Sequence, residues 1–535
     1  MTLTVSHKDY LDKPIWRSMA IPSKGLTVGA AFAYDQRKCA CRSPFTYIIS
    51  ATTTFDIYNQ LLDCWRTTPA FTAVGGSIAA GACAMFVPSH GPNGTISAGA
   101  TTTTFAISAL LNSASAQVNQ LANNGSGIGY YVRVIGNAAG SSGKTEIVQI
   151  VGNSAGTTPT LTVSPALTFT PANGDRYEIL SGRVYLLGAG TTAAGYWKAF
   201  DVATETISGN LATTNLAATI GTETCFVALD EQYVPHDREN GDGFLKGSGT
   251  YNNGILYALV ATGSGATSIT GQAANGDASV LLNEYSRFQI RIVEDTAIPT
   301  AVGQRRKITS HTAGPSPVYT VPAWTVTPSA NAKFVIEQNN DLLVWTGGNT
   351  VTYSYAAGGY ATDANWSTAA AAGGATQVAN PPAAPGAGNV AESCYSLQLD
   401  SSKNCRHGHI VWFRGANTAA LYHLDYAANT WSSAYTLNLS GANLSTGTCS
   451  AHDPAGNHGR YMYINVNATQ NNFRYDLLAR RIEPFAMLPI AQGAAVVCPR
   501  FWVEIHKDGT SYLSNLGLGL CTSTSNNCWS VTLTR

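Results

Sequence analysis

One short pattern recurs four times in this chain of 535 residues and constrains the fold more than any other feature. An apolar residue precedes Asp or Asn, and a large apolar residue follows six positions after it. The four pairs are Asn59 with Trp65, Asp201 with Ile207, Asp425 with Trp431 and Asp476 with Ile482. A β-rich run lies upstream of each pair. Copies at positions 425 and 476 indicate a repeat of about 50 residues, which predicts a β-propeller.

The residue types in this pattern suit a propeller blade. A four-stranded blade has two apolar faces and needs neighbouring blades to bury them. We therefore expect the large apolar residue to fill space between blades, and the Asp or Asn to cap a turn by accepting backbone amides. All eight positions are interpreted as structural. The strand groups predict an all-β fold with about six or seven blades.

A second internal repeat interrupts the propeller. Residues 147–180 and 305–337 share an Ile strand, a polar turn, a Thr-Val strand, a Pro turn and an aromatic-containing strand. Alternating Thr and Val between Pro and Gly predict a small antiparallel β-unit. The aligned steps are Ala155-Gly156 with Ala313-Gly314, Pro165-Ala166 with Pro322-Ala323, and Pro171 with Pro328. We expect both units to project between blades.

These repeats predict four parts of the chain. Residues 1–43 are expected to form an extended arm that docks on a neighbouring subunit, or else to supply a strand near Leu3–Ser6 that completes the last blade. The propeller is expected to contain residues 44–67, 181–283 and 338–535. Residues 68–180 are predicted to be an inserted domain with a short helix at Ala106–Leu121 and one β-module. Residues 284–337 are predicted to be the second β-module.

Charge limits the classes of partner. Lys plus Arg number 31 and Asp plus Glu number 31, so the net charge is zero. Such a chain has no general attraction for nucleic acid or an anionic membrane, and we expect neither partner. Low charge also gives little repulsion between copies, which suits a subunit of a large assembly; a neutral secreted protein is the alternative. No transmembrane helix or apolar signal-peptide core is recognised.

The cysteines leave two alternatives open. Their number is 11, so at least one is free or pairs between chains. Cys521 and Cys528 flank a Ser/Thr/Asn loop and are the candidates for a disulfide that closes a hairpin. Disulfides would suit an extracellular particle, whereas buried free thiols are the alternative.

No motif predicts catalysis or a cofactor. Cys405, His407 and His409 could share a strand face and bind zinc, but a fourth ligand is not visible. The loop His236–Gly243 could hold Ca²⁺ yet lacks EF-hand spacing, and Lys507–Thr510 is only faintly similar to a sialidase turn. Paired carboxylates, a nucleophile elbow and phosphate-binding loops are not recognised. We predict a protein that is not an enzyme and binds no metal or cofactor.

Aromatic residues near Gly-rich loops are the remaining hint of function. Sugars stack on such rings, and protein interfaces favour them, but blade cores contain them too. The set is Tyr130, Tyr131, Tyr196, Trp197, Tyr251, Tyr353, Tyr355 and Tyr360.

The unit at residues 147–180 and 305–337 resembles a β-module common in virion proteins of tailed bacteriophages, and the Asp/Asn steps resemble kelch-type blades. The resemblance implies a structural component of a phage particle, in the tail or neck or on the capsid surface. Such a protein would assemble in the host cytoplasm with other virion proteins and copies of itself, and would then belong to the extracellular particle. The alternatives are a receptor protein that binds a host-surface glycan and, with less support, a propeller enzyme that degrades polysaccharide.

Overall fold

The computed structural model describes the chain as ranges separated by gaps. The described residues are 16–18, 20, 31–34, 45–49, 56–59, 62–68, 82–87, 90–110, 114–125, 127–188, 197–208, 211, 216, 220–221, 224–228, 259–271, 279–337, 341–346, 350–356, 366–368, 378–394, 409–425, 428–445, 448–453, 461–466, 469–477, 479–487, 496–497, 500–507, 511–522 and 528–532.

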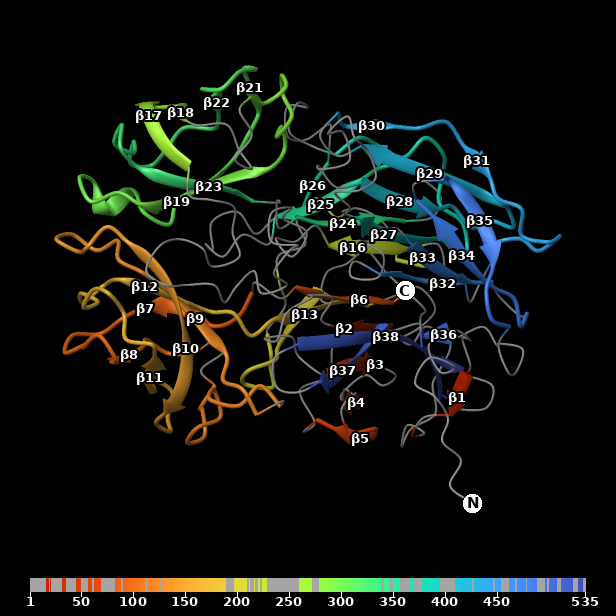
Figure 1. Ribbon diagram of the computed structural model, residues 1–535, viewed down its shortest axis with the longest axis horizontal. Coiled ribbons are helices and arrows are strands. Elements are labelled where there is room, and N and C mark those ends of the chain that lie inside the picture. The colour runs from red at the N-terminus through yellow and green to blue at the C-terminus, as the bar shows by residue number, and fades with distance from the viewer. Residues whose placement is uncertain are drawn as a thin grey trace.

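Eight antiparallel sheets make up the described chain, and six of them are blades of a propeller. The all-β propeller predicted from the repeat is therefore confirmed. The helical element within the described ranges is a 3-10 turn at Pro299–Ala301, and no helix there could span a bilayer. Figure 1 shows the blades in the right half of the molecule and the two other sheets on the left.

The blades are numbered I to VI in chain order. Blade I contains β2 (Ala31–Tyr34), β3 (Phe45–Ile49), β4 (Asp56–Asn59) and β5 (Cys64–Thr67). Blade II contains β6 (Cys83–Val87), β13 (Arg183–Leu187), β14 (Trp197–Asp201) and β15 (Thr206–Ile207). Blade III contains β16 (Cys225–Ala228), β24 (Asp341–Trp345), β25 (Tyr353–Ala356) and β26 (Trp366–Thr368).

The second half of the propeller follows the same plan. Blade IV contains β27 (Val390–Cys394), β28 (His409–Phe413), β29 (Ala420–Asp425), β30 (Thr430–Trp431) and β31 (Tyr435–Thr436). Blade V contains β32 (Cys449–Asp453), β33 (Tyr461–Asn465), β34 (Asn472–Asp476) and β35 (Arg481–Pro484). Blade VI contains β36 (Val496–Val497), β37 (Arg500–Lys507), β38 (Ser511–Thr522), β39 (Cys528–Thr532) and β1 (Trp16–Ser18). The first strands of blades I to V lie side by side around the axis, from β2 through β6, β16 and β27 to β32, and β32 contacts β37 of blade VI.

The N-terminal segment closes the propeller. Strand β1 pairs with β39, and Trp16 lies opposite Val531 in the register. The alternative given for residues 1–43, a strand that completes the last blade, therefore holds with Trp16–Ser18; Leu3–Ser6 lie outside the described residues. The propeller also begins earlier than residue 44, because β2 is the inner strand of blade I.

The repeated Asp/Asn pattern is the hairpin between the third and fourth strands of a blade. Its apolar partners lie directly opposite each other in all four copies: Tyr58 and Trp65, Phe200 and Ile207, Leu424 and Trp431, Tyr475 and Ile482. The Asp or Asn oxygen accepts the amide three residues later in each copy. The donors are Leu62 N to Asn59 (3.2 Å), Thr204 N to Asp201 (3.1 Å), Ala428 N to Asp425 (2.8 Å) and Ala479 N to Asp476 (2.9 Å).

The next position in each hairpin has a left-handed backbone. These residues are Asp63, Glu205, Asn429 and Arg480, with φ between 46° and 56°. The side-chain cap therefore holds a turn that a non-glycine residue adopts at a cost. The apolar residue that ends the pattern is half-buried on an outer strand rather than fully enclosed.

Replacing Asp425 by Ala should destabilise the protein by about 1 kcal/mol, because the amide of Ala428 loses its acceptor. Asp425→Asn should cost less, since Asn59 caps the same turn in blade I. Chemical denaturation of the two variants measures the difference. Equal losses in both would show that the carboxylate charge, and not the turn cap, provides the stability.

The two sheets outside the blades have one topology. The first module contains β7 (Asn93–Thr95), β8 (Thr104–Ala106), β9 (Tyr131–Ile135), β10 (Thr145–Asn153), β11 (Thr160–Ser164) and β12 (Arg176–Ile179). The second contains β17 (Leu259–Gly265), β18 (Ser268–Gly271), β19 (Gln289–Glu294), β20 (Arg305–Lys307), β21 (Ser310–His311), β22 (Val318–Thr320) and β23 (Lys333–Glu337). The strand order is β7-β12-β9-β10-β11-β8 in the first module and β20-β19-β23-β17-β18-β22-β21 in the second. If β20 and β21 together are the equivalent of β10, and each order is read as a cycle, the two orders coincide.

Each module is inserted between the first and second strands of its blade. The first module lies between β6 and β13 of blade II, and the second between β16 and β24 of blade III. The two modules lie next to each other on one side of the propeller (Figure 1). Strands β17 and β18 belong to the second module, so the predicted boundary at residue 284 is too late. A run of short strands predicts a sheet, but it does not show whether that sheet is a blade or an inserted module.

The helix predicted at Ala106–Leu121 is wrong for the described part of that segment. Four of its amides bond to the hairpin between β10 and β11 instead of to a preceding helical turn. The bonds are Ile107 N to Pro159 O, Leu110 N to Thr157 O, Ala116 N to Gly156 O and Asn119 N to Asn153 O. The apolar residues at helical intervals, such as Leu110 and Leu121, instead fill the core of the first module.

Candidate functional site

A cavity of about 200 Å³ lies where the inner strands of blades I to V begin. Three of its wall residues are the first residues of their strands and are cysteines: Cys83 on β6, Cys225 on β16 and Cys449 on β32. Small side chains such as Ala31 and Ala391 leave the space open. The cavity therefore lies on the propeller axis, where five blades contribute to one wall.

The wall that the described residues form is uncharged. Tyr34 and Phe226 supply aromatic surface, and Asn389, Thr448 and Ser450 supply polar groups, and none of the described wall residues is Asp, Glu, Lys, Arg or His. Apolar surface with a few placed polar groups is typical of a small-molecule site. Such a wall suits a neutral polar ligand better than an ion.

The Cys83 thiol is not poised for nucleophilic chemistry. Burial raises the pKa of Cys83 to about 12, so its thiol stays protonated at neutral pH. The thiolate is the form that attacks electrophiles and binds metals. Cys83, Cys225 and Cys449 form no disulfide. These side chains therefore shape the cavity as small, soft apolar groups.

One tight turn leads into three of the inner strands. The amide of the residue before the strand bonds to the carbonyl three residues earlier: Thr224 to Gly221, Asn389 to Gly386 and Thr448 to Ser445. The Thr224 and Thr448 hydroxyls also accept the amides of Gly221 and Ser445. This turn holds the polar wall in place. The sequence signal of this turn is a Thr-Cys or Asn-Val step with Gly or Ser three residues before the Thr or Asn.

The metal-like clusters considered from the sequence lie mostly outside the described residues. Cys405, His407 and the loop His236–Gly243 lie outside the described residues, as do Asp508 and Gly509. His409 begins β28 and lies opposite Cys394 in the register. Among the described side chains, no three His, Cys, Asp or Glu residues could hold one ion.

The eight blade positions are distributed over separate hairpins of blades I, II, IV and V, away from the cavity wall. Cys521 and Cys528 lie directly opposite each other on β38 and β39. This backbone register brings the two positions together, and a disulfide between them stays a prediction.

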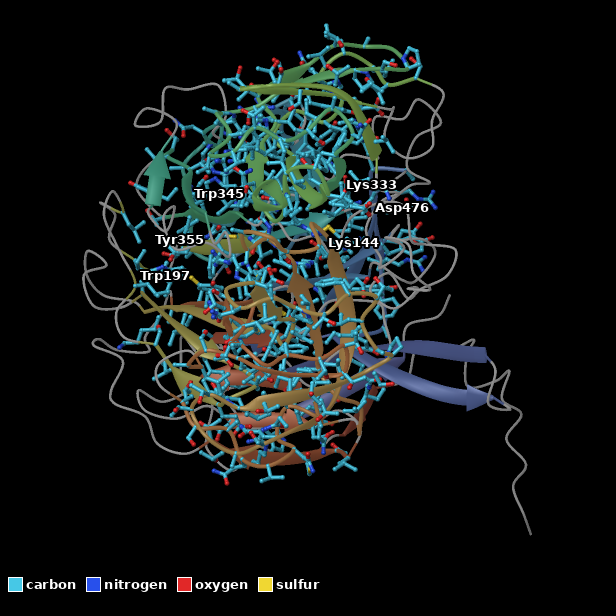
Figure 2. All side chains as sticks on the ribbon, turned by 90° about the vertical axis from the view of Figure 1, so that its left-hand side faces the viewer. Lys144, Trp197, Lys333, Trp345, Tyr355 and Asp476 are labelled. Atoms are coloured by element: carbon cyan, nitrogen blue, oxygen red, sulfur yellow. The ribbon has the colours of Figure 1, made fainter. Side chains whose placement is uncertain are left out.

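Four of the aromatic residues considered for sugar stacking are core residues. Tyr130, Trp197, Tyr353 and Tyr355 are buried. The Trp197 ring contacts Tyr355 at 5.0 Å between centroids, which joins blade II to blade III. Figure 2 shows these two residues close together. A glycan site on these four rings is therefore wrong, because the packing of blades II and III covers Trp197, Tyr353 and Tyr355, and the core of the first module covers Tyr130. Tyr131 is half-buried, and Tyr196, Tyr251 and Tyr360 lie outside the described residues.

A buried charge cluster joins the two modules. Glu178 on β12 accepts Arg133 Nη1 at 2.6 Å and Arg305 Nη2 at 3.1 Å, the latter from the second module. Burial alone would raise the pKa of Glu178. The positive charges of Arg305, Arg133 and Arg291 outweigh the effect of burial and lower this pKa to about 2. The cluster is structural. Its sequence signal is an Arg inside an apolar strand, as in Tyr131–Ile135, and it was missed because periodicity alone assigns such a residue to solvent.

Backbone contacts extend this junction. Asp295 N donates to Gly143 O at 2.8 Å, and Asn137 Nδ2 donates to Val302 O at 3.2 Å. Lys144 forms an isolated backbone bridge with Glu294, and the Glu294 carboxylate binds Lys333. Figure 2 shows Lys144 and Lys333 near each other. The two modules are thus held against each other by charge, hydrogen bonds and backbone pairing.

No family model matches the chain, and no curated protein matches it. Among solved structures, it is similar to Sqt1 from Saccharomyces cerevisiae at 7% identity and a TM-score of 0.29, covering 98% of each chain. It is similar to a GH74 xyloglucanase from Xanthomonas campestris at 12% identity and a TM-score of 0.28, covering 95% of this chain and 53% of that one. It is also similar to an auxiliary nutrient binding protein from Bacteroides thetaiotaomicron at 10% identity and a TM-score of 0.22, covering 84% and 88%.

Proposed function

We propose that this protein binds, without catalysis, an uncharged sugar unit of a surface glycan in the central cavity of the propeller. The uncharged wall of that cavity is the observation that carries the proposal. A space of about 200 Å³ is smaller than the roughly 300–1,000 Å³ of drug-sized sites and suits a single small polar group. Tyr34 or Phe226 would meet the apolar face of the sugar, and the polar wall its hydroxyls.

The placement of the buried carboxylates supports a binding role. Asp201 holds the Thr204 amide and faces Arg183, Asp476 caps its hairpin, and Glu178 joins the modules. Glycoside hydrolysis needs two carboxyl groups that flank one bond. Among the described residues of the cavity wall there is no such pair of carboxyl groups, which supports binding without cleavage.

A structural role in a bacteriophage particle, with other virion proteins and further copies as partners, is the second candidate. Exposed apolar side chains on the modules favour it. Val118 on the first module is 66% exposed and Leu282 on the second is 67% exposed. An assembly contact would cover such groups. Ordered copies of the chain in purified particles would support this role, whereas absence from the particles would exclude it.

Calorimetric titration with a panel of neutral mono- and oligosaccharides tests the binding proposal. Cys83→Leu adds apolar volume inside the cavity and should weaken binding by more than tenfold. Cys64→Leu is the matched control, because Cys64 is exposed on β5 and should bind like the unsubstituted protein. Cys83→Ser keeps the volume and should retain binding.

Two results would contradict the proposal. One is the absence of saturable binding to any neutral sugar by the folded protein. The other is binding that Cys83→Leu leaves unchanged while its thermal unfolding remains cooperative. Shortening of a polysaccharide by the protein would favour the enzyme alternative.

A further inference from the structure

The two modules carry the same tip. In the first module Ala116 forms an isolated bridge with Gly156, and in the second Val280 forms one with Gly314. Three residues after each bridge comes an asparagine with a left-handed backbone, Asn119 at φ 59° and Asn283 at φ 58°. The tips are therefore structural equivalents, defined as residues 114–121 in the first module and 279–286 in the second.

One side chain anchors each tip, and it differs between the modules. In the first module Asn153 Oδ1 accepts the backbone N–H of Leu121 at 2.8 Å, and the backbone N–H of Asn153 donates to Asn119 Oδ1. In the second module His311 Nε2 accepts the Tyr285 amide at 2.8 Å, and the His311 amide donates to Asn283 at 2.8 Å. The Asn153 side chain, which does not titrate, and the His311 imidazole, which does, thus accept the equivalent backbone N–H of their tips.

The anchor in the second module requires a neutral imidazole. His311 Nε2 accepts a backbone N–H, so Nδ1 carries the proton and donates to Thr312 O at 2.9 Å. Protonation of the ring would place a further proton on Nε2. That proton would point at the Tyr285 N–H and break the hydrogen bond between them. Burial accordingly lowers the pKa of His311, with a smaller opposing effect of the Thr312 carbonyl.

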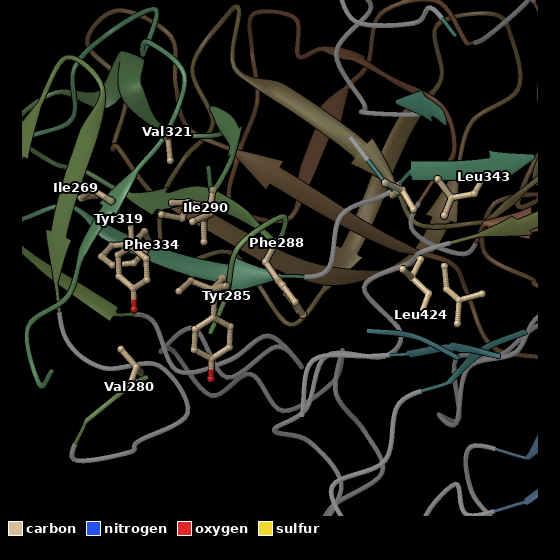
Figure 3. Packing of buried hydrophobic residues seen from close by; sticks show 14 of the residues in the cluster. Ile269, Val280, Tyr285, Phe288, Ile290, Tyr319, Val321, Phe334, Leu343 and Leu424 are labelled. Atoms are coloured by element: carbon tan, nitrogen blue, oxygen red, sulfur yellow. The ribbon is translucent and has the colours of Figure 1, made fainter. Parts of the chain in front are cut away.

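Two aromatic rings lie beside His311, and the tip carries one carboxylate. The Tyr285 ring of the tip lies 6.0 Å from the imidazole, and the Tyr319 ring of β22 lies 5.2 Å from it. Figure 3 shows both phenols pointing the same way from the module core. Glu284, the acidic residue of the tip, accepts the Leu281 amide at 2.7 Å. Protonation of the closed tip therefore costs a backbone hydrogen bond.

We propose that the tip of the second module is a pH-sensitive element that opens when His311 is protonated, while the tip of the first module stays closed. An open tip exposes His311 to solvent, where its pKa is about 6.5. The open form then binds more protons than the closed form, so closure weakens as the pH falls below about 6.5. The opening constant should rise about tenfold between pH 7.5 and pH 5.5.

Hydrogen exchange read by mass spectrometry tests this inference on the full chain. Protection of residues 279–286, corrected for the intrinsic effect of pH, should fall about tenfold relative to residues 114–121 between pH 7.5 and pH 5.5. His311→Asn copies the anchor of the first module and should abolish the difference. Asn153→His should transfer the pH dependence to the first module.

Equal behaviour of the two tips at both pH values would overturn the inference, as would an unchanged pH dependence in His311→Asn. If His311→Asn does not fold, the unsubstituted protein and Asn153→His decide the question between them. Neither readout depends on sugar binding, so the result is independent of the proposed function.

Discussion

Glu178→Ala should lower the free energy of unfolding by about 3–5 kcal/mol, the range for breaking a buried ion pair by removing one partner. The carboxylate lies among Arg133, Arg291 and Arg305, and the Arg133 side chain is 0% exposed. The substitution leaves three cationic groups without this shared counter-charge. The loss should also loosen the junction, because Arg305 belongs to the second module and Glu178 to the first.

Glu294→Ala is the matched control. Glu294 also pairs with a cation, Lys333 at 3.0 Å, but that pair is partly exposed. Exposed pairs contribute roughly 0–1 kcal/mol, so this variant should remain close to the unsubstituted protein. Chemical denaturation of the two variants gives the comparison. A loss in Glu178→Ala no larger than in Glu294→Ala would contradict the role assigned to the cluster.

The same cluster gives a pH signature. The folded-state pKa of Glu178, about 2, lies below its ordinary value near 4.3. The unfolded chain therefore takes up a proton first, and the stability from this group is lost as the pH falls from about 4.3 to about 2. Glu178→Ala should show a smaller loss of stability over that interval than the unsubstituted protein.

Trp345→Ala should destabilise the protein by about 3–5 kcal/mol, the range for deleting a large aromatic side chain from a core. Trp345 on β24 is fully buried and stacks on Trp412 of blade IV at 6.4 Å. Its Nε1 donates to Thr352 Oγ1 at 2.9 Å. The substitution leaves a cavity between two blades and removes the N–H that donates to Thr352 Oγ1.

Trp431→Ala tests whether the loss of stability depends on how deeply the Trp side chain is buried or only on the removal of a Trp. Trp431 contacts both Trp345 and Trp412, at 5.9 and 5.7 Å, but lies half-buried on the outer strand β30. The Trp431→Ala variant should therefore lose less stability than the Trp345→Ala variant. Thermal and chemical unfolding of both variants measure the order. The reverse order would show that the outer hairpin, and not the contact between inner strands, limits stability.

The hairpins were readable from sequence because their bonds are local. The step from Asp425 to Trp431 spans six residues, and that spacing already contains the capped turn and the pairing of Leu424 with Trp431. A repeat of such hairpins predicts blades. The duplicated unit was readable for the same reason, since Gly156 and Gly314 mark equivalent turns with φ of 120° and 117°.

Other features of the fold did not follow from such patterns. Leu110 and Leu121 have helical spacing, yet their segment bonds to another hairpin because strands β10 and β11 offer it partners. Trp197 and Tyr355 follow Gly-rich loops, yet neighbouring blades bury them. Periodicity reports which side chains avoid water, but it does not report which surface covers them.

The sequence by itself determined the local units of this protein: a capped strand hairpin that recurs, and a small β-module that occurs twice. The tertiary structure decided how they close and what they enclose. Strand β1 pairs with β39 from the opposite end of the chain, and Glu178 binds Arg133 and Arg305 across 45 and 127 residues. The central cavity likewise exists only where five inner strands meet. The physical reason is that hairpins form from bonds between near neighbours, whereas closure, buried charge pairs and cavities depend on contacts between segments far apart in sequence.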